Sequence, residues 1–299
     1  EWEAYPTYLD TLVPLVLDAL DRHNLKITFF VVGRDLERAE NVAALRQIVE
    51  RGHEIGNHSY NHEPWMQDYD EARLHDEIKT THDKLTQELG AEPVGFRGPG
   101  FCYSPALLAV LARMGYAFDA STLPSVLGPL ARLYYFASSS MSRGERQTRK
   151  GLFGKFSDGF QPLRPFMWDT SAGPLLEIPV TTIPIFRTPF HLSYLLWLSR
   201  YSRLASRVYF ELAVRLCRMF GFGPSVLLHT MDLLGKDDAP ELHFFPGMDL
   251  DRAYKLDFFD TILTRLTRSF DVVPMSEHAA RIAERRPDTA RALKHRATF

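Results

Sequence analysis

The stretch LKITFFVVGRDLERAENVAALRQIVERGHEIGNHSYNH, residues 25–62, contains the alternation that decides the fold. Its first part, 25–33, is β-branched and aromatic with almost no charge, which is typical of a buried strand. Residues 38–51 place apolar side chains on one helical face, and 53–57 form a second short strand. A strand, a helix and a strand at this spacing indicate a parallel βαβ unit.

The alternation continues on both sides of this unit. We expect further helices over 11–22, 70–89, 105–114, 192–220, 251–269 and from 276, and further strands over 93–97, 116–120, 175–181, 225–230 and 270–274. A closed or partly closed parallel β/α barrel accounts for 299 residues in this order. A doubly wound open sheet is the alternative, but its usual G-x-G-x-x-G signature does not follow any strand.

We expect a single domain over residues 1–299 with a long insertion at about 123–171, which is rich in Ser, Gly, Pro and Arg. The net charge of −2 argues against a nucleic-acid partner. Two cysteines are too few for a disulfide framework or a Cys-built zinc site, and they favour a cytoplasmic location.

Three reactive side chains lie at expected strand ends. His58, Arg97 and His229 each follow or end a strand, and in a parallel β/α barrel these ends converge on the active-site face. His58 and His62 have the i, i+4 spacing that lets two imidazoles bind one metal ion, with Zn, Fe, Co or Ni preferred over Mg or Ca. Taken alone, this spacing is more often an ordinary polar loop.

Four segments in this order give the spacing its context. They are TFFVVG (28–33), GHEIGNHSYNH (52–62), FRGPGF (96–101) and LLHT (227–230). Together they resemble the polysaccharide deacetylase family, the NodB-homology carbohydrate esterases, over about 8–122 and 174–284. The resemblance implies an α/β fold, a distorted parallel NodB-like β/α barrel. One branch of that family acts on lipid-linked amino sugars.

The resemblance also implies roles for individual residues. His58 and His62 would bind a divalent metal, most simply Zn²⁺, with Co²⁺, Fe²⁺ or Ni²⁺ as alternatives, and Ser59 would stabilise their loop. Arg97 and Pro99 would form one groove wall, and Arg97 would orient the catalytic base. The backbone N–H of Gly100 would help bind the oxyanion.

His229 would then be the general acid that protonates the leaving amine. The family's fourth motif supplies an aspartate and an aromatic residue near this histidine. Trp168-Asp169 and Glu177 are both candidates for that motif. His191 is one of several histidines that stand apart from any partner motif, and we expect it to be structural.

The sequence departs from the family pattern where a strand with two carboxylates should precede the first helix. Glu1 is a tentative third metal ligand, Glu3 is a weaker one, and two exposed glutamates at a frayed end are an equal alternative. The catalytic base is then expected upstream of Glu1, on a first strand missing from this chain. Gly100 also replaces a common aromatic residue.

These features predict a metal-dependent hydrolase that removes an N-acyl group, most simply N-acetyl, from an amino sugar in a polysaccharide or lipid-linked glycan. A hydrolase of a small amide or imide and a catalytically silent carbohydrate-binding relative are the alternatives. Basic residues in 143–155 and from 281 onward, beside the apolar run 183–198, suit peripheral contact with a membrane or a lipid-linked substrate. A solvated lid and a packed helix explain them equally well.

Overall fold

A computed structural model describes residues 6–128, 156–239 and 247–285 of the chain. Its sheet has the strand order β1-β2-β3-β4-β6-β5. The strands are β1 (Thr28–Val31), β2 (Glu54–Asn57), β3 (Gly95–Phe96), β4 (Phe118–Asp119), β5 (Phe166–Thr170) and β6 (Gly173–Glu177). All neighbouring pairs are parallel except β5 and β6, which form an antiparallel hairpin.

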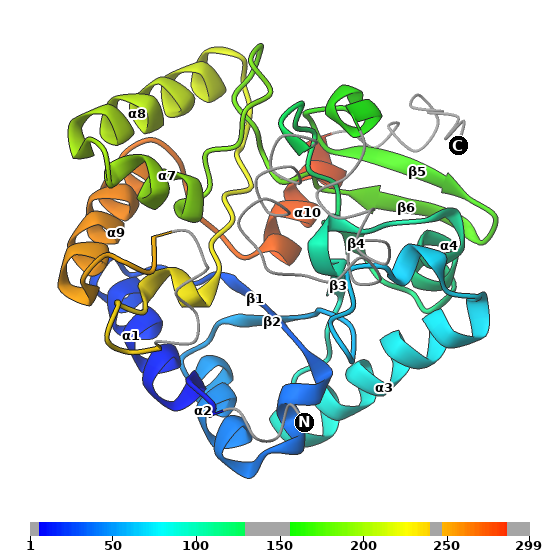
Figure 1. Cartoon of the computed structure of the whole chain (residues 1–299). Coiled ribbons are helices and arrows are strands. Elements are labelled where there is room, and N and C mark those ends of the chain that lie inside the picture. The colour runs from blue at the N-terminus through cyan, green and yellow to red at the C-terminus, as the bar shows by residue number, and fades with distance from the viewer. Residues whose placement is uncertain (1–5, 129–155, 240–246, 286–299) are drawn as a thin grey trace, which may run out of the picture.

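Helices lie around this sheet (Figure 1). They are α1 (Leu9–Arg22), α2 (Ala39–Glu50), α3 (Glu71–Leu89), α4 (Pro105–Arg113), α7 (Leu192–Ser199), α8 (Arg203–Met219), α9 (Arg252–Thr267) and α10 (Met275–Arg285). The parallel strands follow one another in chain order without the reversal that defines a doubly wound sheet. The fold is therefore α/β with a mostly parallel sheet, as expected for a β/α barrel, although the described strands do not close a ring.

Local signals in the sequence account for the helix ends. Asp70 caps α3 by accepting a hydrogen bond from the N–H of Arg73, and Gly90 ends the helix with φ 67°. The Ser104 side chain accepts from the N–H of Leu107, so the expected cap of α4 is confirmed. None of the helices in the described part of the chain is both long and apolar enough to cross a bilayer.

Two expected strands do not form. Residues 225–230 and 270–274 contain no strand, and only single backbone bonds, such as Thr181 N to Ser225 O, connect the first of them to its neighbours. A cavity lies between these two segments and β1, so neither segment reaches β1 to form a ladder with it. Their β-branched composition indicated extended chain, but a ladder also requires a partner at about 4.8 Å.

Two further expectations need correction. The helix expected over 192–220 is two helices, because Ser202 leaves helical geometry and caps α8 through the N–H of Ala205. The insertion was expected to reach residue 171, but its end contains the strand β5. This strand has alternating burial and pairs with β6. Residues 129–155 of the insertion lie outside the described part of the chain. The single-domain assignment stays a prediction.

The close contact between Gly95 and Phe118 gives a test of the packing beneath the sheet. A Cβ on Gly95 would lie 2.0 Å from Cζ of the fully buried Phe118 ring. We expect Gly95→Ala to lower the free energy of unfolding by about 1–3 kcal/mol, because the core must absorb an extra methyl group. Urea denaturation measures this, with Val94→Ala as the exposed control. A second change, Phe118→Leu, should restore part of the loss, and no rescue would contradict the packing described.

Candidate active site

Four polar side chains meet at the carboxyl ends of neighbouring parallel strands. His58 follows β2, Arg97 follows β3, Asp119 ends β4 and Glu177 ends β6. Asn57 pairs with Phe96, and Asp119 pairs directly with Glu177, so the register brings these ends to one level. This edge is where active sites lie in parallel β/α folds.

The loop after β2 is shaped by side chains on both sides. Ser59 has φ 62° and His62 has φ 56°, which are left-handed conformations that need compensating bonds. The Ser59 hydroxyl accepts from the N–H of His62 at 3.1 Å, as the resemblance implied for this serine. Glu77 on α3 accepts from the N–H groups of Tyr60 and Asn61 at 3.0 Å each. The role of Glu77 was not predicted, because an acidic residue on a long amphipathic helix normally faces solvent.

His58 and His62 come together as expected, with ring centroids 4.8 Å apart. His58 Nδ1 lies 2.6 Å from the carbonyl oxygen of Arg97, so Nδ1 carries the proton and Nε2 is left free. Burial, and then the neighbouring His62, hold the pKa of His58 well below its usual value, so the ring is neutral. A neutral imidazole fixed by a carbonyl is the usual state of a metal ligand.

A third metal ligand is not found within the described residues, where no group of three His, Cys, Asp or Glu side chains is close enough to hold an ion. Glu1 and Glu3, the two candidates from the sequence, lie outside the described residues. The resemblance to a metal site therefore rests on the two imidazoles and on the backbone carbonyl that orients one of them.

Arg97 is fixed between two strands. Its Nε donates to the carbonyl of Ala120 at 3.0 Å, and its guanidinium lies 4.4 Å from the centre of the Phe30 ring. Burial lowers the pKa of Arg97 to about 10, although the carboxyl groups of Asp119 and Glu177 oppose that shift. The side chain stays positively charged at neutral pH, and it lines the same cavity as both metal-site histidines.

Asp119 and Glu177 form a fully buried carboxyl pair beneath Arg97. Glu177 accepts from Thr122 and, at 2.9 Å, from Trp168 Nε1, while Asp119 accepts from Ser121. Burial and mutual repulsion raise the pKa of Glu177 well above its usual value, and burial raises that of Asp119. Asp119 Oδ2 has no hydrogen-bond partner among the described residues, and the raised pKa values mean that the pair keeps a proton at a pH where two free carboxyl groups would both be ionised.

The fourth-motif candidates differ in burial. Asp169 is exposed, whereas Glu177 is buried with Trp168 as its partner, and the carboxylate that accepts from the N–H of His229 is that of Asp232. Asp119 was missed. Its position at the end of an expected strand was a usable signal, because it matches the positions of His58 and Arg97.

The turn after Arg97 is tightly packed. A Cβ on Gly98 would lie 2.1 Å from the carbonyl oxygen of Cys102, so only glycine fits there. The Gly98 N–H donates to Ser121 Oγ at 2.7 Å. Pro99 is buried, whereas Gly100, with φ 61°, is exposed and lines the cavity. The backbone at Gly100 therefore borders the space where an acyl group would bind.

His229 reaches the cavity from the other side and ends no strand. Its Nδ1 lies 3.0 Å from Ser193 Oγ, which in turn donates to Asp232 Oδ2 at 3.0 Å. Asp232 also accepts from the N–H of His229 at 2.9 Å. This chain of bonds fixes the ring with Nδ1–H toward Ser193 Oγ. Desolvation and the charge of Arg97 lower the pKa of His229.

Of the expected site residues, all but Pro99 and the undescribed Glu1 border one cavity of about 1710 Å³ with a mainly apolar lining. Its polar residues include His58, His62, Arg97, Gly100 and His229. His191, expected to be structural, also lines this cavity, and its ring centroid lies 6.2 Å from that of His229. The His191 side chain is buried, and its Nδ1 has no hydrogen-bond partner among the described residues.

Comparison with known proteins agrees with this arrangement. Residues 3–118 match the family model described as polysaccharide deacetylase. Peptidoglycan-N-acetylglucosamine deacetylase of Bacillus cereus is 36% identical over 86 residues, which are 29% of this chain and 30% of that protein. Chitooligosaccharide deacetylase of a Bradyrhizobium strain is 33% identical over 105 residues, 35% of this chain and 47% of that protein.

The chain spans less than half the length of these curated relatives. A solved structure from Mycobacterium smegmatis, described as a candidate polysaccharide deacetylase, covers 93% of this chain and 79% of its own, with a TM-score of 0.58 at 20% identity. That likeness shows a common fold. Residues 3–118 are thus similar to the polysaccharide deacetylase family, and the chain as a whole shares the fold of that solved structure.

Proposed function

We propose that this protein is a metal-dependent hydrolase that removes an N-acyl group, most simply N-acetyl, from an amino sugar. One observation carries the proposal, which is that five expected site residues border one cavity. They are the neutral histidines His58 and His62, the buried Arg97, the exposed Gly100 and the fixed His229. Two relatives whose names specify deacetylation of N-acetylglucosamine in peptidoglycan and of chitooligosaccharides support the substrate class.

His58 and His62 would hold the metal, because the Arg97 carbonyl fixes His58 in the tautomer that presents Nε2. Two imidazoles suit zinc and other borderline ions, and we propose Zn²⁺. A carboxylate from the segment around Glu1 would complete the set. When bound, such an ion lowers the pKa of a water molecule and polarises the acyl oxygen.

The chain's own groups would stabilise the developing negative charge and position the catalytic residues. The Gly100 backbone would face the acyl oxygen, where an N–H stabilises negative charge as it develops. Arg97 would place a fixed positive charge in the cavity and orient the catalytic carboxylate. Asp119 and Glu177 would hold Arg97 in position, because they carry one negative charge between them rather than two.

His229 would take up a proton at Nε2 as water attacks the acyl carbon and would then pass that proton to the departing amine, because an amide nitrogen leaves poorly without one. The bonds through Ser193 to Asp232 would keep its Nε2 aimed at the cavity. Ser193 and Asp232 would thus be positioning residues that act through His229. A cavity of about 1710 Å³ is larger than a small amide or imide requires, which favours a sugar substrate. The cytoplasmic location stays a prediction.

Metal binding can be tested directly. We expect the protein to bind one equivalent of zinc, and His58→Ala to weaken binding by at least about 100-fold, more than the loss of a supporting residue. Elemental analysis after gel filtration measures this, with His75→Ala on α3 as the control. Release of amine from N-acetylated sugars should follow zinc content. Zinc-free but folded wild-type protein that binds sugar would instead support the silent carbohydrate-binding alternative.

The role of Ser193 can be separated from stability. Ser193→Ala should lower kcat by about tenfold or more with little change in KM, since it releases the general acid from its orienting bond. It should also shift the acidic limb of the pH profile of kcat, which a purely structural change would not do. Ser199→Ala is a matched control, because Ser199 is a buried serine on the same helix that bonds only to the carbonyl of Leu196. Equal kinetics for both variants would remove Ser193 from the mechanism.

The shared proton of Asp119 and Glu177 predicts a pH effect on stability. The folded pair keeps a proton that the unfolded chain releases above about pH 4, so the pair favours folding at low pH and loses this as pH rises. Glu177→Gln should therefore gain stability relative to wild type between pH 5 and 8, by about 1.4 kcal/mol for each unit by which the pKa is raised. Urea unfolding at both pH values measures it, with exposed Glu92→Gln as the control. A parallel pH dependence in wild type and Glu177→Gln would contradict a shared proton.

A further inference from the structure

The helix α8 has two apolar faces. One face packs into the core through Phe210, Ala213, Val214 and Cys217, all of which are buried. The opposite face carries Leu204, Val208, Leu212 and Met219, which are 72%, 59%, 43% and 68% exposed. Leu204, Val208 and Leu212 follow i, i+4 spacing, and Met219, two turns after Leu212, continues the same helical stripe. We call this stripe the α8 face.

The α8 face lies at the outer edge of the molecule (Figure 1). Just before α8, Tyr201 is 71% exposed, and its ring centroid lies 5.3 Å from that of Trp197 on α7. Large exposed apolar side chains at one helix and its entry are uncommon on a monomeric surface and mark an interaction site. Trp and Tyr are the aromatic residues that favour the boundary between water and hydrocarbon.

An apolar turn is attached beside the same helix. Tyr209 Oη lies 2.9 Å from Thr188 Oγ1 and from the carbonyl oxygen of Pro189. At the tip of that turn, Ile185 and Phe186 are 66% and 56% exposed. Ile185 has φ 75°, which is strained for a β-branched residue. The backbone is therefore strained at a tip whose apolar side chains are exposed to water.

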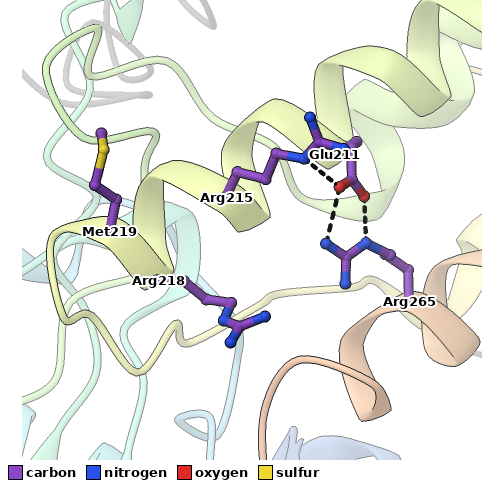
Figure 2. A pocket seen from close by; sticks show the side chains of 5 residues that line it. All are labelled: Glu211, Arg215, Arg218, Met219 and Arg265. Carbon is purple, nitrogen blue, oxygen red and sulfur yellow. Dashed lines mark hydrogen bonds and ion pairs between the residues drawn. The ribbon is translucent and has the colours of Figure 1, made fainter.

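Arginines border the stripe on one side. Arg207 and Arg218 have no ion-pair partner among the described residues, while Arg215 and Arg265 share Glu211. In Figure 2, Arg218 lies apart from the bonded group of Glu211, Arg215 and Arg265. Met219 is the residue that follows Arg218. The hollow that these five residues line carries three positive charges against one negative charge. The surroundings of the stripe are thus cationic.

We propose that the α8 face binds the surface of a membrane that contains anionic lipids. An apolar stripe with interfacial aromatics would enter the headgroup region, and Arg207 and Arg218 would contact lipid phosphates. Charge favours this occupant over a second copy of the chain, because two such faces would bring arginines against arginines. The proposal does not depend on the proposed deacylation.

The aromatic pair that precedes α8 reaches the wall of the candidate active site through Trp197. Trp197 belongs both to the exposed aromatic pair and to the cavity lining, and Leu198 also lines the cavity from α7. Contact with a bilayer through α8 would therefore place the mainly apolar cavity beside the lipid surface. A substrate whose sugar is attached to a lipid chain could enter there without leaving the membrane.

Vesicle sedimentation tests the proposal. The full chain should bind vesicles of phosphatidylcholine with phosphatidylglycerol more tightly than vesicles of phosphatidylcholine alone, and salt should weaken the difference. Leu204→Gln/Val208→Gln should reduce binding by at least about tenfold, from lost apolar burial. Arg207→Gln/Arg218→Gln should reduce binding to anionic vesicles by about fivefold for each arginine. Val94→Gln and Arg113→Gln, exposed residues away from α7 and α8, are the matched controls.

Quenching by lipids brominated in their acyl chains gives a second measurement. Fluorescence of the full chain should fall on binding, and Trp197→Phe should remove most of that fall. Absence of wild-type binding, or equal loss in the control variants, would overturn the proposal. Vesicle-independent self-association that Leu204→Gln/Val208→Gln abolishes would also overturn it and assign the α8 face to a dimer. Because none of these measurements uses the reaction, failure here leaves the proposed hydrolase standing, and the reverse is also true.

Discussion

The bond between His58 Nδ1 and the Arg97 carbonyl oxygen is the contact on which the site depends. It exists only because β2 and β3 end at one level, where the N–H of Arg97 donates to Asn57 O at 3.0 Å. The same pairing sets the direction of the Arg97 side chain, which leaves its strand toward Phe30 and Ala120. One backbone register thus orients both an expected metal ligand and the main positive charge of the cavity.

That charge requires compensation, since a buried guanidinium without a partner is strongly destabilising. Two ionised carboxylates would over-compensate a single arginine, whereas a pair that shares one proton carries one negative charge. Asp119 and Glu177 meet this need because β4 and β6 place them opposite each other. The donors from Ser121, Thr122 and Trp168 then stabilise the pair without adding a second charge. Arg97 stays charged and fixed as a result.

The sequence predicted the local elements well because their signals are local. The strands β1 to β4 and helices α1 to α4 follow from apolar periodicity and caps such as Ser104. The residues that complete the site depend on contacts across long separations, which periodicity does not reveal. Ser193 and His229 are 36 residues apart, and Glu77 meets Tyr60 across 17 residues. The strand expected before His229 failed for a similar reason, since a strand needs a partner as well as a composition.

The same limit applies to α8, where periodicity predicted a helix but could not distinguish its two apolar faces. A helix that is apolar on opposite sides is explained only when each side has a partner, and packing against α7 and α9 supplies a partner for one. Arg207 and Arg218 border the outward stripe and form no ion pair among the described residues, where Glu211 is bonded to Arg215 and Arg265. A surface that is both anionic and partly apolar would bury the stripe and pair with the arginines, whereas water solvates only the arginines. The outward face of α8 is thus better matched to a lipid boundary than to bulk solvent.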